Sequence, residues 1–187
     1  MRLDYGLFRL INQGLGCDLL DGVFAELSSL GTWTIALVAL AWLADSGRRV
    51  FWRHVLALAL ALALIGSVNL VIKVTVGRTR PVKTLTNVRI VDRVVPESRS
   101  FPSGHALTAF FFMTYVALAR RRCRVWALLL ASAVAFSRVY VGMHFPSDIF
   151  AGAALGALGG WLGWVGFDRW LNPNPERAPA GVTARRV

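Results

Sequence analysis

Charged residues are scarce in this sequence, and acidic residues are the scarcest. Only 17% of the 187 residues are charged, and 10 aspartates and glutamates stand against 21 lysines and arginines, which gives a net charge of +11. Apolar residues make up 56% of the chain and come in long blocks, whereas a soluble protein would space them at a helical or strand period. The composition therefore excludes an ordinary soluble domain and indicates a polytopic membrane protein.

Cysteine is nearly absent too. Cys17 and Cys123 are the only two, and the topology expected below puts them on opposite sides of the membrane, so we expect no disulfide. The N-terminal segment lacks the continuous apolar core of a signal peptide, and the chain shows no long-period repeat. We expect one transmembrane domain over residues 1–170 and a polar, mobile cytoplasmic tail over residues 171–187.

Five apolar blocks are each close to the roughly 20 residues that a helix needs to cross a bilayer. We therefore predict an all-α integral membrane bundle of five transmembrane helices, or six, with an amphipathic helix over residues 4–16 at the membrane interface. Glu26 and small polar residues interrupt the first block, which is either one long tilted helix or a short helix followed by a true span. The blocks are residues 19–43, 55–76, 102–119, 125–141 and 148–167.

Arginines indicate which side of the membrane each loop occupies. The short loops 45–54 and 120–124 are dense in arginine and fall on the same side as the tail, so we assign that side to the cytoplasm. The opposite side carries the N-terminus, the loop 77–101 and the turn 142–147. The loop 77–101 is also basic, either because it binds a second phosphate or anionic head groups, or because it is a solvated, lipid-facing loop. Its uncertain cations are Arg78, Lys83, Arg89, Arg93 and Arg99.

Two groups of polar residues flank this basic loop. Lys73 closes the second block and is followed after six residues by Arg80; the lysine is either a phosphate ligand or a snorkelling residue at the membrane boundary. The sequence Pro102-Ser103-Gly104-His105 predicts a helix start, with Ser100 or Phe101 as the N-cap and Pro102 as the first helical residue. Its unpaired N–H groups and dipole favour an anion such as phosphate.

A third group lies at the turn before the last block. Arg138 follows a long uncharged run, and a cation within or near a membrane is a functional hypothesis by default. Pro146 predicts the start of the next helix, which leaves Asp148 in the first turn, where it can turn back toward His144. A carboxylate on one imidazole nitrogen leaves the other nitrogen for attack or proton transfer. The alternative is a structural cap-and-turn pair.

All three groups must lie on one side of the membrane. Two histidines, three cations and a helix N-terminus make a site for a phosphate monoester or a diphosphate. The residues that we expect to converge are Lys73, Arg80, Ser103, Gly104, His105, Arg138, His144 and Asp148.

The three groups resemble the signature motifs of the type 2 phosphatidic acid phosphatase superfamily, complete and in order. The resemblance is tight over residues 73–148, and within the superfamily the chain is most similar to small bacterial membrane enzymes that dephosphorylate undecaprenyl diphosphate and related lipid phosphates. Members often have six spans, and we expect this chain to lack the first of them. The motifs are Lys73-x6-Arg80-Pro81, Pro102-Ser103-Gly104-His105 and Ser137-Arg138-x5-His144-x3-Asp148.

The resemblance implies a role for each residue. His144 would be the nucleophile, oriented by Asp148, and His105 would protonate the leaving oxygen and later activate water. No metal and no cofactor are implied, and few carboxylates are available for a two-metal site. The expected phosphate ligands are Lys73, Arg80, Ser103, Gly104 and Arg138.

The leading functional hypothesis is hydrolysis of the terminal phosphate of a polyprenyl diphosphate, at the periplasmic or outer face of a bacterial inner membrane. Phosphatidylglycerophosphate, phosphatidate or lipid A are alternative substrates, and transfer of the phosphate to another lipid is an alternative reaction. A catalytically inactive lipid-binding protein is disfavoured by the intact motifs, and a channel by charges that gather at one face. We expect lipid phosphates and membrane lipids as partners and no nucleic acid; the oligomeric state is left open.

Two further features have structural interpretations. Gly152, Gly156 and Gly160 recur every four residues, which favours tight packing inside the bundle over dimerisation. His54 lies in a cytoplasmic loop and is expected to be structural.

Overall fold

A computed structural model describes residues 2–44, 46–91, 95 and 97–171. Helices are the only regular elements in these ranges, which agrees with the predicted all-α class. The predicted tail falls almost wholly outside the described residues. The helices are α1 (Arg2–Arg9), α2 (Asp18–Ala44), α3 (Arg48–Val76), α4 (Pro81–Thr84), α5 (Gly104–Ala119), α6 (Arg124–Tyr140) and α7 (Pro146–Gly166), with the short turns η1 (Leu10–Gly14), η2 (Arg121–Cys123) and η3 (Phe167–Leu171).

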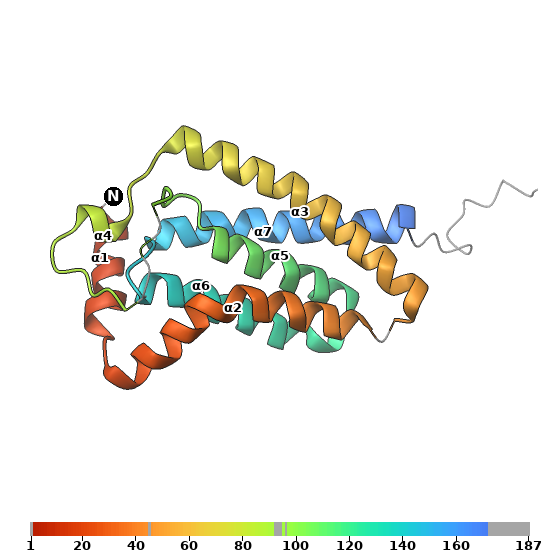
Figure 1. Cartoon of the computed structure of the whole chain (residues 1–187), viewed down its shortest axis with the longest axis horizontal. Coiled ribbons are helices and arrows are strands. Elements are labelled where there is room, and N and C mark those ends of the chain that lie inside the picture. Colours follow the sequence, from red (N-terminus) through yellow and green to blue (C-terminus); the bar gives the residue numbers. More distant parts are fainter. Residues whose placement is uncertain (1, 45, 92–94, 96, 172–187) are drawn as a thin grey trace, which may run out of the picture.

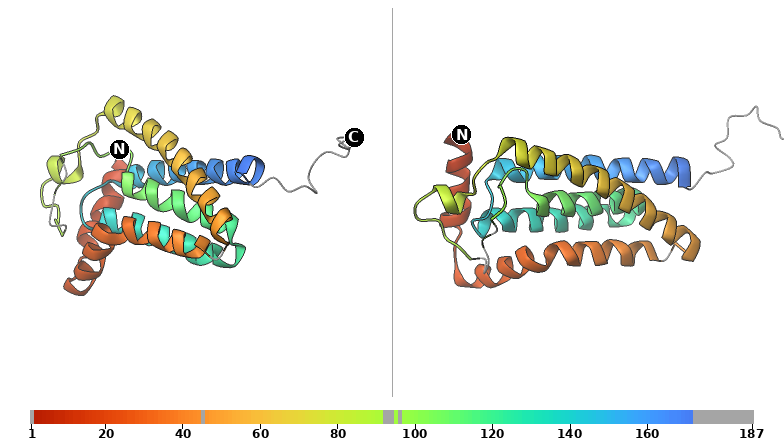
Figure 2. Two further views of the ribbon diagram at one scale, coloured as in Figure 1. Left: turned by 45° about the vertical axis from the view of Figure 1, so that its right-hand side comes forward. Right: turned by 45° about the horizontal axis from the view of Figure 1, so that its top comes forward.

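The long helices form a bundle around α5 (Figure 1). Helix α5 packs against α7, α6 and α2, while α3 packs mainly against α7. The short helix α1 lies across one end of the bundle, beside α4 and the turn between α6 and α7 (Figures 1 and 2). The core is built from aliphatic and aromatic side chains such as Ile35, Phe111, Met113 and Val134, all fully buried. Helix α1 and the basic loop therefore cover only one of the two ends of the bundle.

Helix α7 approaches α5 more closely than ordinary side chains would allow. A Cβ atom on Gly152, Gly156 or Gly160 would collide with backbone oxygens of α5, those of Ser103, Leu107 and Phe111 respectively. The glycine face is therefore occupied by packing within the bundle, as predicted, and it sets the α5–α7 distance at the end where the signature motifs lie.

The described helices agree with a membrane bundle in outline. Three segments are long and apolar enough to cross a bilayer: residues 48–84, 121–140 and 146–169. Helix α2 is bent by 64° between its halves 18–29 and 33–44, which are long and apolar enough to cross a bilayer only when taken together. Helix α5 is apolar but only 16 residues long. The number of crossings, and the interfacial position of α1, remain predictions.

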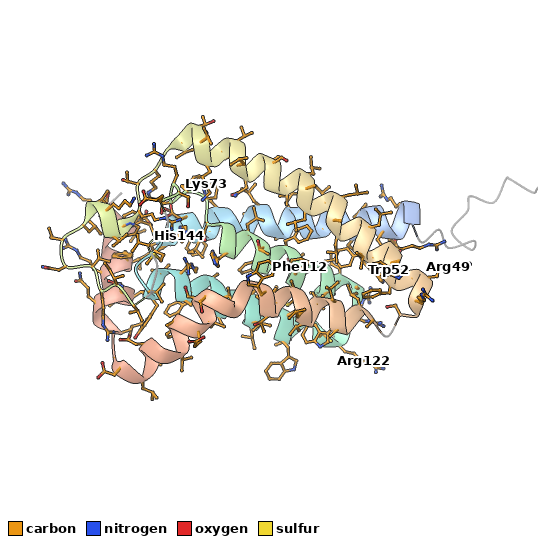
Figure 3. All side chains as sticks on the ribbon, in the orientation of Figure 1. Arg49, Trp52, Lys73, Phe112, Arg122 and His144 are labelled. Carbon is orange, nitrogen blue, oxygen red and sulfur yellow. The ribbon has the colours of Figure 1, made fainter. Side chains whose placement is uncertain are left out.

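The two ends of the bundle carry the loops that the sequence assigns to opposite sides. Arg49 and Arg122 lie at one end and Lys73 and His144 at the other (Figure 3). Both cysteines are free, as expected. At the arginine-rich end His54 is buried: its Nδ1 lies 2.8 Å from the Tyr115 hydroxyl, and its ring stacks on Phe167 at 3.7 Å. These contacts agree with a structural role for His54.

Candidate active site

The end of α3, the start of α5 and the turn between α6 and α7 are joined by direct hydrogen bonds. Lys73 Nζ donates to the carbonyl of Pro102 (2.9 Å), and the backbone N–H of Ser103 donates to the carbonyl of Asp148 (3.0 Å). Arg80 Nη1 donates to the carbonyl of Met143 (3.0 Å). The three motifs therefore interlock at one end of the bundle, as their order along the spans predicts.

His144 and Asp148 form the pair that the spacing predicts. Asp148 lies in the first turn of α7, and its Oδ2 is 3.5 Å from Nδ1 of His144. The turn is tight because the His144 N–H donates to the Arg138 carbonyl (3.1 Å), while the Phe145 N–H donates to Asp148 Oδ2 (2.9 Å). A distance of 3.5 Å lies within the range of an ion pair and is long for a hydrogen bond.

Arg80 fixes the tautomer of the His144 ring. Its Nη1 lies 3.1 Å from Nε2 of His144, and a guanidinium can only donate. Nε2 must therefore carry the lone pair, and the ring proton sits on Nδ1, facing Asp148. Arg80 is itself held by the carbonyl and the hydroxyl of Ser98, each at 2.9 Å. A lone pair at Nε2 beside a cation is the arrangement that attack on a phosphate requires.

Ser100 is a member of this cluster that sequence reasoning missed. Its Oγ donates to Asp148 Oδ2 at 2.5 Å and lies 3.4 Å from Nδ1 of His144. Ser100 and Asp148 are both fully buried, so the serine helps to satisfy a carboxylate that water does not reach. The sequence suggested only a capping role for Ser100, because a serine two residues before the proline of a helix start gives no other signal.

The predicted start of the α5 helix was wrong by two residues. Ser103, not Ser100 or Phe101, is the N-cap: its backbone is extended, its Oγ accepts from the Ala106 N–H at 3.4 Å, and the helix begins at Gly104. Pro102 therefore precedes the helix instead of opening it. The Ser103 hydroxyl oxygen therefore accepts the capping hydrogen bond, and the hydroxyl hydrogen is not used in the cap. Gly104 and His105 occupy the first turn, next to the first turn of α7.

Lys73 donates to two backbone carbonyls, and Arg138 contacts a serine of α2. Lys73 Nζ donates to the carbonyl of Arg99 (3.0 Å) as well as to that of Pro102, so it ties α3 to the segment before α5. Arg138 is almost fully buried, and its Nη1 contacts both the hydroxyl and the carbonyl of Ser28 on α2. Both cations thus join separate segments of the bundle, and their role as phosphate ligands remains a prediction.

The electrostatic environment keeps His144 neutral. Burial is the main cause that lowers the pKa of His144, to about 4, and the positive charges of Arg80 and Arg138 act in the same direction. Asp148 opposes them. At neutral pH the imidazole is therefore unprotonated and its Nε2 lone pair is available.

The loop cations are held by carboxylates, which neither alternative for the loop anticipated. Arg78 pairs with Asp4 and Asp148, Lys83 pairs with Glu97, and Arg89 pairs with Asp21. Arg99 is exposed, and Arg93 lies outside the described residues. Much of the basic charge in this loop is thus neutralised by ion pairs within the chain.

Within the described residues, no three His, Cys, Asp or Glu side chains come close enough to hold a metal ion. The carboxylate nearest to His144 is engaged by Ser100, the Phe145 N–H and Arg78. That the reaction needs no metal remains a prediction, for which an activity test is given below.

Comparison with known proteins gives the family. The model of the PAP2 superfamily matches residues 54–171. Undecaprenyl-diphosphatase of Sulfolobus acidocaldarius is 30% identical over 165 residues, which cover 86% of this chain and 74% of that protein. Lipid A 4'-phosphatase of Bacteroides thetaiotaomicron is 32% identical over 116 residues, or 58% of this chain, and the match spans about half (52%) of that relative.

Two solved structures resemble this fold. The crystal structure of Aquifex aeolicus LpxE gives a TM-score of 0.67 at 29% identity and covers 86% of this chain and 94% of its own. A PAP2-type phosphatidylglycerolphosphate phosphatase from Bacillus subtilis shares the fold, with a TM-score of 0.69 at 23% identity. The match covers 90% of this chain and 88% of that protein's chain. The chain belongs to the PAP2 superfamily, whose members among these relatives are phosphatases of lipid phosphates.

Proposed function

We propose that this protein is a membrane phosphatase that removes the terminal phosphate of a polyprenyl diphosphate such as undecaprenyl diphosphate. The observation that carries the proposal is the His144 ring: its Nε2 accepts from Arg80 at 3.1 Å, and its Nδ1 faces Asp148 at 3.5 Å. This arrangement suits an imidazole nucleophile with a cation on the attacking side and a carboxylate behind it.

In the proposed first step, the Nε2 lone pair of His144 attacks the terminal phosphorus. A nitrogen–phosphorus bond forms as the bond from that phosphorus to the bridging oxygen breaks, and His105 gives its proton to the leaving lipid phosphate. Asp148 stabilises the positive charge that develops on the ring. Arg80, Lys73 and Arg138, with Ser103 and the Gly104 N–H, are the proposed ligands of the phosphoryl oxygens.

In the proposed second step, His105 accepts a proton from water while the water oxygen attacks phosphorus. The nitrogen–phosphorus bond breaks, and inorganic phosphate and neutral His144 are released. The cycle is balanced without a redox partner or a cofactor. If an acceptor lipid took the place of water, the same intermediate would give phosphotransfer.

The substrate and the cellular setting are the finer parts of the proposal. The match to an undecaprenyl-diphosphatase over 86% of this chain supports a polyprenyl diphosphate. Lipid A is the second candidate, because a lipid A 4'-phosphatase is 32% identical over 116 residues. We propose a bacterial inner-membrane protein with this site at the periplasmic or outer face, since the arginine-rich loops lie at the other end.

The test is phosphate release by the full chain in nanodiscs, measured on undecaprenyl diphosphate, lipid A, phosphatidylglycerophosphate and phosphatidate. We expect the highest kcat/KM for the diphosphate, with the rate unchanged by a chelator. His144→Gln should abolish release, whereas His54→Asn, at the other end of the bundle, should retain it. Release from none of these lipids, or a rate that falls with chelator and returns with a divalent metal, would contradict the proposal.

A further inference from the structure

Arg78 occupies an unusual position in the network, because it joins the N-terminal helix to the carboxylate behind His144. Its Nη1 donates to Asp148 Oδ1 (2.7 Å) and to Ser147 Oγ (2.6 Å), and its Nη2 donates to Asp4 Oδ2 (2.5 Å). Arg78 lies within the six variable residues of the first motif, so the motif itself gives it no role.

Asp4 holds this arginine from the far side. Its Oδ1 accepts from the backbone N–H of Ser147 (2.9 Å), and its Oδ2 accepts from the Ser147 hydroxyl (2.7 Å) as well as from Arg78. Asp4 thereby caps the first turn of α7, the turn that carries Asp148. Burial acts to raise the pKa of Asp4, but the hydrogen bonds from Arg78 and Ser147 lower it overall, so Asp4 is a carboxylate at neutral pH.

Aromatic packing supports the same link. The Arg78 guanidinium lies over the ring of Phe145, 4.1 Å from the ring centroid. Phe145 directly follows His144 in the sequence. From α1, Tyr5 meets the Phe145 ring edge-on at 5.1 Å and Phe8 packs on it at 5.5 Å. Helix α1 therefore contacts the His144 turn through an ion pair and through aromatic rings.

The two oxygens of Asp148 have different partners, and these partners indicate how Arg78 acts on His144. Arg78 binds Oδ1, while Oδ2 accepts from Ser100 and from the Phe145 N–H and faces His144. A carboxylate held at both oxygens cannot rotate freely, so Arg78 helps to fix the direction in which Oδ2 faces His144. The Asp148 side chain is fully buried, so its ion pair with Arg78 is little screened by water.

We propose that Arg78, held by Asp4 of α1, is a positioning residue that orients Asp148 and, through Asp148, the nucleophilic ring of His144. This inference rests on the proposed function. Arg78 touches the carboxylate and not the ring, so its loss should reduce kcat and leave KM nearly unchanged. A cavity of about 540 Å³ also borders Arg78, and a residue that bound a substrate phosphate there would instead raise KM when removed.

The charge environment of His144 determines the direction of the expected pH effect. Removing the Arg78 charge leaves the negative charge of Asp148 without its ion-pair partner, and an unpaired carboxylate beside the ring raises the affinity of His144 for a proton. The charged groups that act on the ring are Arg80 in the segment after α3, Arg138 on α6 and Asp148 on α7. Arg78 binds Asp148, and Asp4 on α1 binds Arg78. Lys73 at the end of α3 and His105 in the first turn of α5 are the titratable groups of the two other motifs.

The experiment compares Arg78→Gln, Asp4→Asn and their double variant with a matched pair in the same loop. Arg89 pairs with Asp21 at 2.5 Å, so Arg89→Gln and Asp21→Asn remove an equally short ion pair that does not contact Asp148. Steady-state kinetics on undecaprenyl diphosphate are measured together with a ¹⁵N-histidine NMR titration, in which His144→Gln assigns the ring signal.

We expect Arg78→Gln to lower kcat about tenfold to a hundredfold, the size that the loss of an outer partner of a functional group has elsewhere, with KM within about twofold. The His144 titration should move up by about one pH unit. Asp4→Asn should lower kcat less than Arg78→Gln does. The double variant should have nearly the kcat of Arg78→Gln, because Asp4 is proposed to act through Arg78. The Arg89→Gln and Asp21→Asn variants should not change the pH at which His144 titrates.

Two results would overturn the inference: a rise in KM with kcat retained, or a His144 titration that does not move in Arg78→Gln. If Arg78→Gln does not fold, Arg78→Lys takes its place, because an ammonium keeps the charge but lacks the planar fork whose Nη1 and Nη2 bind Asp148 and Asp4 separately. Wild-type kcat in Arg78→Lys would also overturn the inference. The NMR readout needs no turnover. A wild-type chain that hydrolyses no lipid phosphate while the titration still moves would therefore refute the proposed function and not the positioning of His144.

Discussion

Arg80 Nη1 lies 3.1 Å from Nε2 of His144, the nitrogen that we propose as the nucleophile. The same guanidinium donates to the carbonyls of Met143 and Ser98, so its position is fixed by the protein before any substrate arrives. A phosphate that reaches Nε2 must take over the Arg80 contact. We therefore propose that the cation that contacts the ring binds the phosphoryl group during the reaction.

Replacement of Arg80 by lysine tests this exchange. A lysine keeps the charge but cannot bind Ser98, Met143 and the phosphate in one plane. We expect kcat/KM on the best lipid substrate to fall about 10²–10³-fold, as it does when a preorganised donor to a developing charge is removed. Wild-type kcat/KM in Arg80→Lys, with normal folding, would show that Arg80 is structural only.

His105 should matter for both proposed steps. His105→Asn removes the group that protonates the leaving oxygen and later activates water, and we expect kcat to fall about 10²–10⁴-fold. A substrate with a good leaving group, such as an aryl phosphate, needs less protonation, so the first step should recover in a rapid-quench assay while the second stays slow. Equal loss of both steps on both substrates would argue against a proton-transfer role.

The pH profile should reflect the low proton affinity of His144. Its pKa is lowered to about 4, and protonation removes the Nε2 lone pair. Activity that depends on the neutral ring should therefore persist as the pH falls through 6.5, the ordinary value for an imidazole, and disappear only near pH 4. The measurement is kcat/KM against pH, corrected for the ionisation of the substrate. An acid limb near pH 6.5 would contradict this environment for His144.

Gly156 should be sensitive to a single added methyl group. Its Cβ would collide with backbone atoms of Leu107, which cannot move without shifting α5, so we expect Gly156→Ala to destabilise the bundle by about 1–3 kcal/mol. Gly66→Ala on α3 is the control, because nothing lies within 4 Å of its Cβ position. Unfolding of both variants in the same detergent tests the prediction, and equal stability would count against tight α5–α7 packing.

The arrangement of the three motifs could be predicted from sequence because each of them closes or opens an apolar block. Helix ends on one side of a membrane must meet, so the block boundaries alone bring Lys73, Gly104 and His144 to the same end. The His144–Asp148 pair followed from Pro146, which fixes the start of α7. These predictions depend on local order along the chain.

The remaining parts depend on contacts between distant segments, which no local pattern reveals. Asp4 and Arg78 are 74 residues apart, and Ser100 and Asp148 are 48 apart. The N-cap of α5 was placed too early because a proline is favoured at the first helical position, whereas here Ser103 caps the helix after it. The bend in α2 contains no proline, and only the polar residues that interrupt the first apolar block indicated a break there.

The central claim is that a phosphoryl group passes through the ring of His144. The direct test is to mix the full chain with undecaprenyl diphosphate labelled in its terminal phosphate, quench in alkali within milliseconds, and locate the label by peptide mass spectrometry. The account predicts an alkali-stable, acid-labile phosphate on residue 144 that forms and decays at the rate of turnover. Turnover with no such adduct, or with the label on another side chain, would contradict it.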